Sequence, residues 1–252
     1  MTRMAVFFVA AACTGGAPAP PTHERYVLTR ELVPTTATEA RAFGIDLDGD
    51  AVPDNQLGDV LSSVRALFAM NFQALADTNQ ATQQIELVWP GETGDAEFML
   101  DASEPLTLPT EHPPYLSVPG ILTLQSSVLG SPLALELRHA RVRIRERTET
   151  GLTGSIGGGL TNEQVSSQLL PAFVALVDGV VKRDCAPAIA DCNCALGSAG
   201  ADWLYALDAT HDCAITLDEV IASRTVEKLL APDVRADGID LLSFATDFVA
   251  DR

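Results

Sequence analysis

Two stretches of the chain carry apolar side chains at every third or fourth position, which is the spacing of an amphipathic helix. The first covers residues 56–80 and the second covers residues 165–180. Thr161 and Gln164 form a capping-box sequence before the second stretch, and Pro171 is expected to kink or divide it. The pattern therefore predicts two long helices.

Between these stretches the apolar residues gather in short β-prone runs that proline and glycine separate. Runs of this kind are typical of an antiparallel sheet or a sandwich. We therefore predict an α+β fold in which an antiparallel β-sheet or sandwich packs with the two long helices. The predicted strands are residues 85–89, 97–100, 121–124, 133–137 and 140–147.

Two segments of this region could bind an anion. A basic residue at every second position from Arg141 to Arg147 places four arginines on one face of a strand. Such a row is more often a solvated face, or it pairs with neighbouring Asp and Glu. The glycine-rich residues 154–159 lack the Lys-Ser/Thr ending and the glycine spacing of phosphate-binding motifs, so we interpret them as a loop.

Residues 208–219 place oxygen-bearing side chains at positions 1, 3, 5, 9 and 12, the ligand spacing of an EF-hand calcium loop. Ca²⁺ prefers roughly six to eight oxygens, and a short loop supplies them when a bidentate carboxylate closes the shell. Apolar residues on both sides predict a helix-loop-helix. The candidate ligands are Asp208, Thr210, Asp212 and Glu219 through side-chain oxygens, Ala214 through its carbonyl, and Thr216 at the position often occupied through water.

Position 6 of this loop is Cys213, where such loops usually carry glycine. The chain turns sharply at this position, and a residue with a Cβ atom is strained in a left-handed conformation. Either a disulfide holds the turn or the site is weak. The alternative interpretation is an acidic surface turn without a metal.

A second acidic cluster, residues 46–54, has carboxylates at positions 1, 3, 5 and 9 of the same numbering. These carboxylates repel one another unless a cation neutralises them; the alternative is again a plain acidic turn. Position 6 is Ala51 and position 12 is Leu57, so the closing carboxylate must come from elsewhere, and Asp59 is the nearest candidate. The candidate ligands are Asp46, Asp48, Asp50 and Asp54, with Val52 at position 7. A third run, residues 233–240, has the composition of such a loop but not its ligand spacing.

The first residues indicate export. Residues 1–12 have one basic residue, a short apolar run and small residues just before Cys13, which is typical of a lipoprotein signal peptide with Cys13 as the lipidated residue. An ordinary signal peptide cleaved near Ala12 or Ala17 is the alternative, and it also exports the protein. The Gly/Pro-rich sequence after Cys13 predicts a tether, so residues 13–43 are expected to be lipid anchor and flexible linker. Membrane contact is expected through the lipid alone.

The other four cysteines are Cys185, Cys192, Cys194 and Cys213, and an even number in an exported chain predicts two disulfides. A bond from Cys192 to Cys194 would close a very tight ring. Two connectivities therefore remain: Cys185 to Cys192 with Cys194 to Cys213, or Cys185 to Cys194 with Cys192 to Cys213. A zinc site of four thiols is a weaker alternative because zinc ribbons usually bring paired C-x₂-C hooks.

The chain has 252 residues, a formal charge of −18 and 47% hydrophobic residues. The apolar content is enough for a sizeable core. The acidic balance argues against a nucleic-acid partner, which needs a basic face, and it suits cation binding. The four histidines are scattered and no catalytic motif is recognisable, so we expect a protein that is not an enzyme.

The lipoprotein-type leader, the Asp-rich loop before a helix, the β-rich middle and the EF-hand-like loop together resemble myxobacterial-type calcium-binding lipoproteins. The first loop is similar to those of thrombospondin type 3 repeats. The resemblance covers most of the chain and implies calcium sites and export, without an established activity. It names no protein or glycan partner.

We therefore expect an exported lipoprotein of the cell envelope that binds Ca²⁺ structurally. The alternative is a hydrolase or a carrier of lipids or small ligands that uses the β-rich middle as its cleft. The predicted domain organisation is signal peptide 1–12, anchor and linker 13–43, an α+β core 44–181, and a disulfide-stapled EF-hand-like module 182–252.

Overall fold

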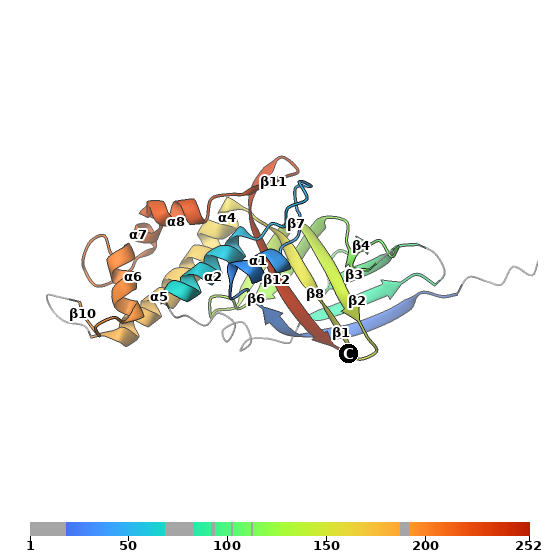
Figure 1. The fold of residues 1–252 in the computed structure, drawn as a ribbon, viewed down its shortest axis with the longest axis horizontal. Helices are drawn as coiled ribbons and strands as arrows, with labels where there is room; N and C mark the ends of the chain where they lie inside the picture. Colours follow the sequence, from blue (N-terminus) through green and yellow to red (C-terminus); the bar gives the residue numbers. More distant parts are fainter. Residues whose placement is uncertain (1–18, 69–82, 92–93, 102, 112, 187–191) are drawn as a thin grey trace, which may run out of the picture.

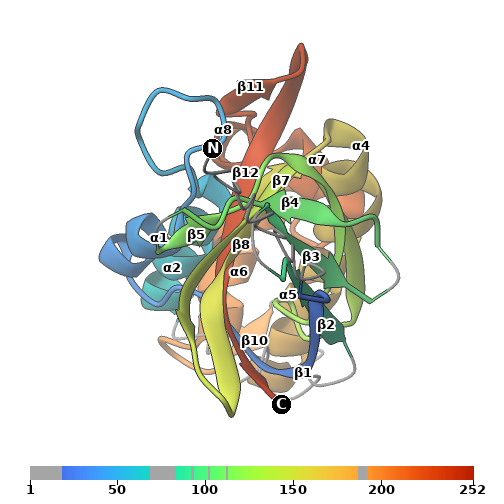
Figure 2. The ribbon, with the colours of Figure 1, turned by 90° about the vertical axis from the view of Figure 1, so that its right-hand side faces the viewer.

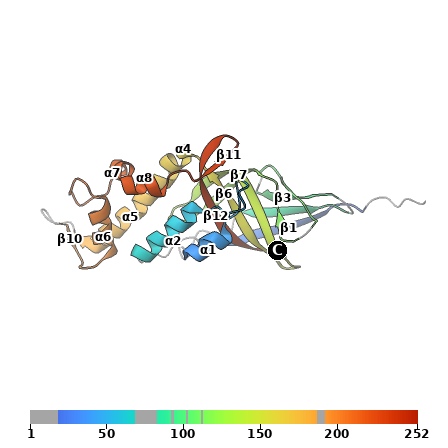
Figure 3. The same ribbon diagram turned by 45° about the horizontal axis from the view of Figure 1, so that its top comes forward.

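The computed structural model describes residues 19–68, 83–91, 94–101, 103–111, 113–186 and 192–252. The molecule is elongated and combines α and β structure. A large sheet occupies one end, and the helices after residue 161 gather at the other end (Figures 1 and 3).

One antiparallel sheet of ten strands forms the sheet end. Its order is β4-β3-β2-β1-β12-β8-β7-β5, with β6 paired to β7 and β11 paired to β12. The strands are β1 (Thr22–Leu32), β2 (Gln84–Trp89), β3 (Ala96–Leu100), β4 (Leu106–Leu108), β5 (Tyr115–Leu116), β6 (Gly120–Ser126), β7 (Leu133–Arg147), β8 (Gly151–Leu160), β11 (Val234–Ala236) and β12 (Ile239–Asp251).

The helices lie before β2 and between β8 and β11. A short two-stranded sheet lies among the helices of the second group, near the disulfides. Its strands are β9 (Cys185–Ala186) and β10 (Asn193–Cys194). The helices are α1 (Ala37–Phe43), α2 (Gln56–Phe68), α4 (Asn162–Gln164), the π-helical turn η1 (Val165–Leu169), α5 (Leu170–Asp184), α6 (Ala199–Leu207), α7 (Leu217–Ala222) and α8 (Arg224–Leu229).

The sheet curls until its edges approach each other, so that it is nearly barrel-shaped (Figure 2). The backbone N–H of Val118, which follows β5, donates to the carbonyl of Thr107 in β4 at 2.7 Å and links the two edges. Phe98, Phe244 and Phe248 are fully buried in the core. Core side chains thus occupy the inside of the sheet, where the alternative hypothesis places a cleft.

The predicted flexible linker is wrong for residues 22–43, because this part of the chain forms β1 and α1. Strand β1 lies between β2 and β12 in the sheet. Tyr26 and Leu28 are buried on one face of β1, and Glu24 is buried on the same face. An acidic residue at an inward position breaks the apolar alternation by which a strand is recognised.

The predicted strands 133–137 and 140–147 form one long strand, β7, with a bulge between them. The pairing register shifts between Arg138 and Arg141, and His139 there has a positive φ of 50°. A bulge inserts an extra residue and exchanges the two faces of the strand. The buried residues accordingly change from odd to even numbers: Leu133, Leu135 and Leu137 before the bulge, and Ala140, Val142 and Ile144 after it.

The glycine-rich residues 154–159 belong to a strand, β8, and their interpretation as a loop is wrong. This strand pairs with β7 on one side and with β12 on the other. A Cβ atom at Gly159 would lie 2.5 Å from that of Leu241, and one at Gly158 would lie 2.8 Å from that of Leu137. Because glycine has no Cβ atom, side chains of the neighbouring strands can pack closely against both faces of β8.

The predicted boundary between residues 181 and 182 does not separate two folding units. Strand β12 lies in the middle of the large sheet, between β1 and β8. One continuous hydrophobic core joins the sheet to Leu61 of α2, Val177 of α5 and Trp203 of α6. The C-terminal third of the chain thus completes the core formed by the rest.

The two predicted helices are found in part. The described portion of the first is α2, and residues 69–80 lie outside the described residues. Thr161 and Gln164 form the predicted capping box, and a π-helical turn directly before Pro171 breaks the regular helix. By length and composition alone, Asn162–Asp184 is long and apolar enough to cross a membrane. Here the segment contributes Leu169 and Val177 to the core, as a core helix of a folded domain does.

Candidate metal centres

The first acidic loop connects α1 to α2. A β-bridge between Ile45 and Asp54 closes its base. One carboxylate oxygen each from Asp46, Asp48 and Asp50 lie within 4.8 Å of one another. Like charges at this separation repel, and a cation among them would relieve that repulsion.

Backbone N–H groups order the carboxylates of this loop. Asp46 accepts hydrogen bonds from the N–H of Gly49 at 2.7 Å and of Ala51 at 3.0 Å. Asp50 accepts one from the N–H of Val52 at 2.7 Å. The carboxylates at positions 1 and 5 thus hold the backbone of the loop in a tight curve.

The second acidic loop connects α6 to α7. Asp208, at its first position, is buried and accepts hydrogen bonds from the N–H groups of Asp212 at 3.2 Å and Cys213 at 3.0 Å. Asp212 accepts one from the N–H of Ala214 at 3.0 Å. The chain thus folds around the side chain of Asp208 as it does around that of Asp46.

Glu219, at the twelfth position, accepts hydrogen bonds from residues on both sides of the second loop. One carboxylate oxygen accepts hydrogen bonds from the N–H and hydroxyl of Thr210, both at 3.0 Å. The other oxygen accepts from the N–H and hydroxyl of Thr216, at 3.0 and 2.9 Å, in the capping box of α7. The backbone hydrogen bond from Thr216 is the main cause that lowers the pKa of Glu219 to about 2. Glu219 is therefore ionised at neutral pH.

The two loops share two left-handed residues and two hydrogen bonds although they lie far apart in the sequence. At position 4, Gly49 and His211 have positive φ angles of 86° and 57°. At position 6, Ala51 and Cys213 both have a φ of 67°. The left-handed turn at the missing glycine is thus present in both loops. In each loop, position 1 also accepts from the N–H of position 6, and position 5 from that of position 7.

A disulfide holds the turn of the second loop. Cys192 is bonded to Cys213, and Cys185 is bonded to Cys194, which selects one of the two predicted connectivities. The predicted alternative, a zinc site of four thiols, is excluded because all four sulfur atoms are in disulfides. The first loop has no such support, since position 6 there is Ala51.

Asp54, at position 9 of the first loop, is partly buried and lies in the field of other carboxylates. Burial raises the pKa of Asp54 to about 6, and the negative charges of Asp48, Asp233 and Asp50 add to this effect. Asp59, the predicted closing residue, is exposed in the first turn of α2. Asp233 comes from the third acidic run, and accepts hydrogen bonds from the N–H and hydroxyl of Ser243. The sequence analysis set this run aside because its spacing is wrong, but the pairing of β11 with β12 places Asp233 where its charge acts on Asp54.

The arginine row of β7 supports the first loop and the sheet. Arg141 donates to the backbone carbonyl of Asp46 at 2.9 Å, and Arg143 donates to the carbonyl of Ala42 at the end of α1 at 2.6 Å. Arg145 forms a two-pronged ion pair with Asp247, and Arg147 forms one with Glu24. All four arginines have protein partners, so the row is structural, in agreement with the pairing alternative.

A histidine and an aspartate meet in a separate cleft of about 420 Å³ between β6, β7 and the β11–β12 turn. Nδ1 of His139 lies 3.1 Å from a carboxylate oxygen of Asp237, and both residues have positive φ angles. The described lining of this cleft contains no serine, threonine or cysteine that could act as a nucleophile.

Cys13 and the predicted signal peptide lie outside the described residues. No protein-family model, no curated protein and no solved structure matches the chain.

Proposed function

We propose that the protein binds Ca²⁺ at both acidic loops and that the ions act structurally, as clamps at the junctions between helices. The observation that carries the proposal is the set of features that the loops share, with left-handed residues at positions 4 and 6 and carboxylates at positions 1 and 5 that accept the N–H groups of positions 6 and 7. Hard cations such as Ca²⁺ prefer oxygen ligands of this kind in a flexible arrangement.

In the first loop the ligands are Asp46, Asp48, Asp50 and Asp54, with the carbonyl of Val52. Convergence of three of these carboxylates within 4.8 Å supports this assignment. In the second loop Glu219 closes the shell together with Asp208, Asp212, Thr210, Thr216 and the carbonyl of Ala214. The ionised Glu219, which accepts hydrogen bonds from Thr210 and Thr216 on both sides of the loop, supports that assignment.

Calcium titration of metal-free protein tests the proposal. We expect saturable heat in calorimetry at up to millimolar Ca²⁺, the range of extracellular modules. We also expect a higher melting temperature, because a ligand at a hundred times its Kd adds about 2.7 kcal/mol to the free energy of unfolding. Mg²⁺ should bind much more weakly, since it needs near-ideal octahedral geometry.

Single substitutions assign the sites. Asp48→Asn should remove the heat of the first loop and leave that of the second, and Glu219→Gln should do the reverse. Asp95→Asn, which changes an exposed carboxylate outside both loops, is the matched control. Absence of any response of the wild-type protein to millimolar Ca²⁺ would contradict the proposal.

We also propose that the protein is exported, carries a lipid on Cys13, and contacts the membrane through that lipid. The lipoprotein-type sequence of residues 1–13 supports this assignment. In a bacterial host, the wild-type protein should enter the detergent phase on detergent partitioning, and Cys13→Ser should enter the aqueous phase. Equal partitioning of the two proteins would contradict lipidation.

A further inference from the structure

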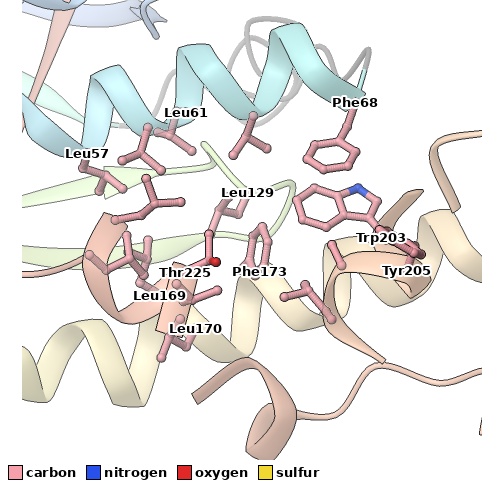
Figure 4. A pocket seen from close by; sticks show the side chains of 17 residues that line it. Leu57, Leu61, Phe68, Leu129, Leu169, Leu170, Phe173, Trp203, Tyr205 and Thr225 are labelled. Atoms are coloured by element: carbon pink, nitrogen blue, oxygen red, sulfur yellow. The ribbon is translucent and has the colours of Figure 1, made fainter. Parts of the chain in front are cut away.

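A cavity of about 460 Å³ lies between the helices (Figure 4). Its walls come from α2, from η1 and the start of α5, from α6, and from α8. Protein interiors are normally close-packed, with few voids larger than a water molecule. A space of this size falls in the range of binding sites for small ligands.

The lining of this cavity is almost wholly apolar. Aliphatic side chains such as Leu61, Leu169 and Val226 form most of it, and the described lining contains no charged side chain. At one end Phe68 stacks on Trp203 with ring centroids 3.7 Å apart, and Phe173 meets Trp203 edge-on at 5.3 Å. Trp203 is buried, and its indole N–H has no hydrogen-bond partner. Such a surface favours a hydrocarbon and gives a charged head group no counter-ion.

The cavity is elongated along α2. Leu57 lines one end and Phe68 the other, as Figure 4 shows, which corresponds to about 16 Å along the helix axis. An extended hydrocarbon of about a dozen carbons has this length. We propose that the cavity binds one aliphatic chain of the acyl type, held by its methylene groups rather than by its head group.

The bound aliphatic chain comes either from a free fatty acid or from an acyl group of a larger lipid. Both offer the same hydrocarbon to the cavity, and they differ in what remains outside it. Comparing dodecanoate, dodecanol and a lysophospholipid with a twelve-carbon chain separates these sources. Similar affinity for dodecanoate and dodecanol, each much higher than that for octanoate, is the expected result for recognition of the chain.

The protein has two tryptophans, Trp89 and Trp203, and this makes a direct test possible. Trp89 lies on β2 against Tyr115 and Arg147, so Trp89→Phe leaves Trp203 as the single reporter in the cavity wall. We expect 12-bromododecanoate, below its micelle concentration, to quench the fluorescence of Trp203 saturably. Unbrominated dodecanoate should compete, and the affinity should rise about fourfold per added methylene from eight to twelve carbons.

Substitutions that fill the cavity provide the second test. Val60 and Val64 line it from α2, and Ser63 lies on the exposed face of the same helix. Val64→Phe and Val60→Phe should each weaken binding at least tenfold without lowering the melting temperature, and Ser63→Phe should bind like the wild type. Using both valine variants guards against one that fails to fold.

Three results would overturn the proposal: quenching that does not saturate, affinity that does not depend on chain length, or filled variants that bind like the wild type. All measurements are made both with millimolar Ca²⁺ and with a chelator. Acyl binding with no response to Ca²⁺ would contradict only the proposed metal sites, and a response to Ca²⁺ with no acyl binding would contradict only the cavity proposal.

Discussion

At the scale of single residues, the buried acids of the sheet are the least expected feature of this molecule. Glu31 at the end of β1 is only 2% exposed, and the hydroxyl of Ser126 lies 2.9 and 3.0 Å from its two carboxylate oxygens. Burial raises the pKa of Glu31 to about 7, against the lowering effect of these hydrogen bonds. Glu31 therefore titrates near neutral pH in the folded protein.

This titration predicts a pH-dependent stability. Because the folded pKa lies above the unfolded value of 4.5, the folded state holds the proton more tightly, and stability falls as the pH rises from about 4.5 to about 7. The loss is on the order of 3 kcal/mol for a shift of this size. Glu31→Gln should remove this part of the slope and raise the free energy of unfolding above pH 7, measured by urea denaturation.

The exposed Glu97→Gln on β3 is the control for that experiment, and its slope should match that of the wild type. An unchanged pH slope in Glu31→Gln would show that Glu31 does not titrate in this range.

Sequence reasoning succeeded where a residue's role depends on its immediate neighbours. At Cys213, where glycine is missing, the sequence left a disulfide-held turn or a weak site as alternatives, and the structure has a left-handed residue and a disulfide there. Sequence reasoning could not give the partners of Arg145 and Arg147, because Asp247 and Glu24 are more than a hundred residues away. Such pairs depend on the register of the whole sheet, which local patterns do not contain.

At the scale of elements, the second acidic loop combines a disulfide with a strained residue, and the two effects can be separated. The bond from Cys192 to Cys213 spans 21 residues. In the chain-entropy model its removal costs on the order of 3 kcal/mol. With Cys192→Ser, Cys213→Gly should be more stable than Cys213→Ala by about 1 kcal/mol, because glycine adopts positive φ without strain.

Ala51→Gly in the first loop should likewise stabilise the protein by about 1 kcal/mol, since Ala51 has the same φ of 67° and no disulfide. Urea unfolding under oxidising conditions measures all of these variants. Equal stability of the glycine and alanine variants in both loops would contradict the strain.

The elements that the sequence missed were hidden by specific residues. In β1 the inward Glu24 masks the alternation, and its partner Arg147 comes from a distant strand. In β8 the glycines carry no side chains to show a period, yet neighbouring side chains cover both faces. The bulge at His139 made one strand look like two. In each case tertiary contacts override the local preference.

At the scale of the whole molecule, the central position of β12 predicts that the chain folds only as a unit. Residues 44–181 lack β1 and β12, so β2 and β8 would each lose a pairing partner. Expressed alone or together with 182–252 as a second chain, this segment should show no cooperative thermal unfolding and no near-ultraviolet circular dichroism. A cooperative transition in residues 44–181 alone would contradict this prediction and support the domain boundary expected from the sequence.

The neighbouring places of β1 and β12 in the sheet also bear on how the protein is made. Among the described elements β1 is synthesised first and β12 last. At about 5–20 residues per second, β1 waits roughly ten to forty seconds for this partner during synthesis. The sheet cannot close before β12 has been synthesised, and until then β1 and β8 each present an unpaired edge that a chaperone could hold.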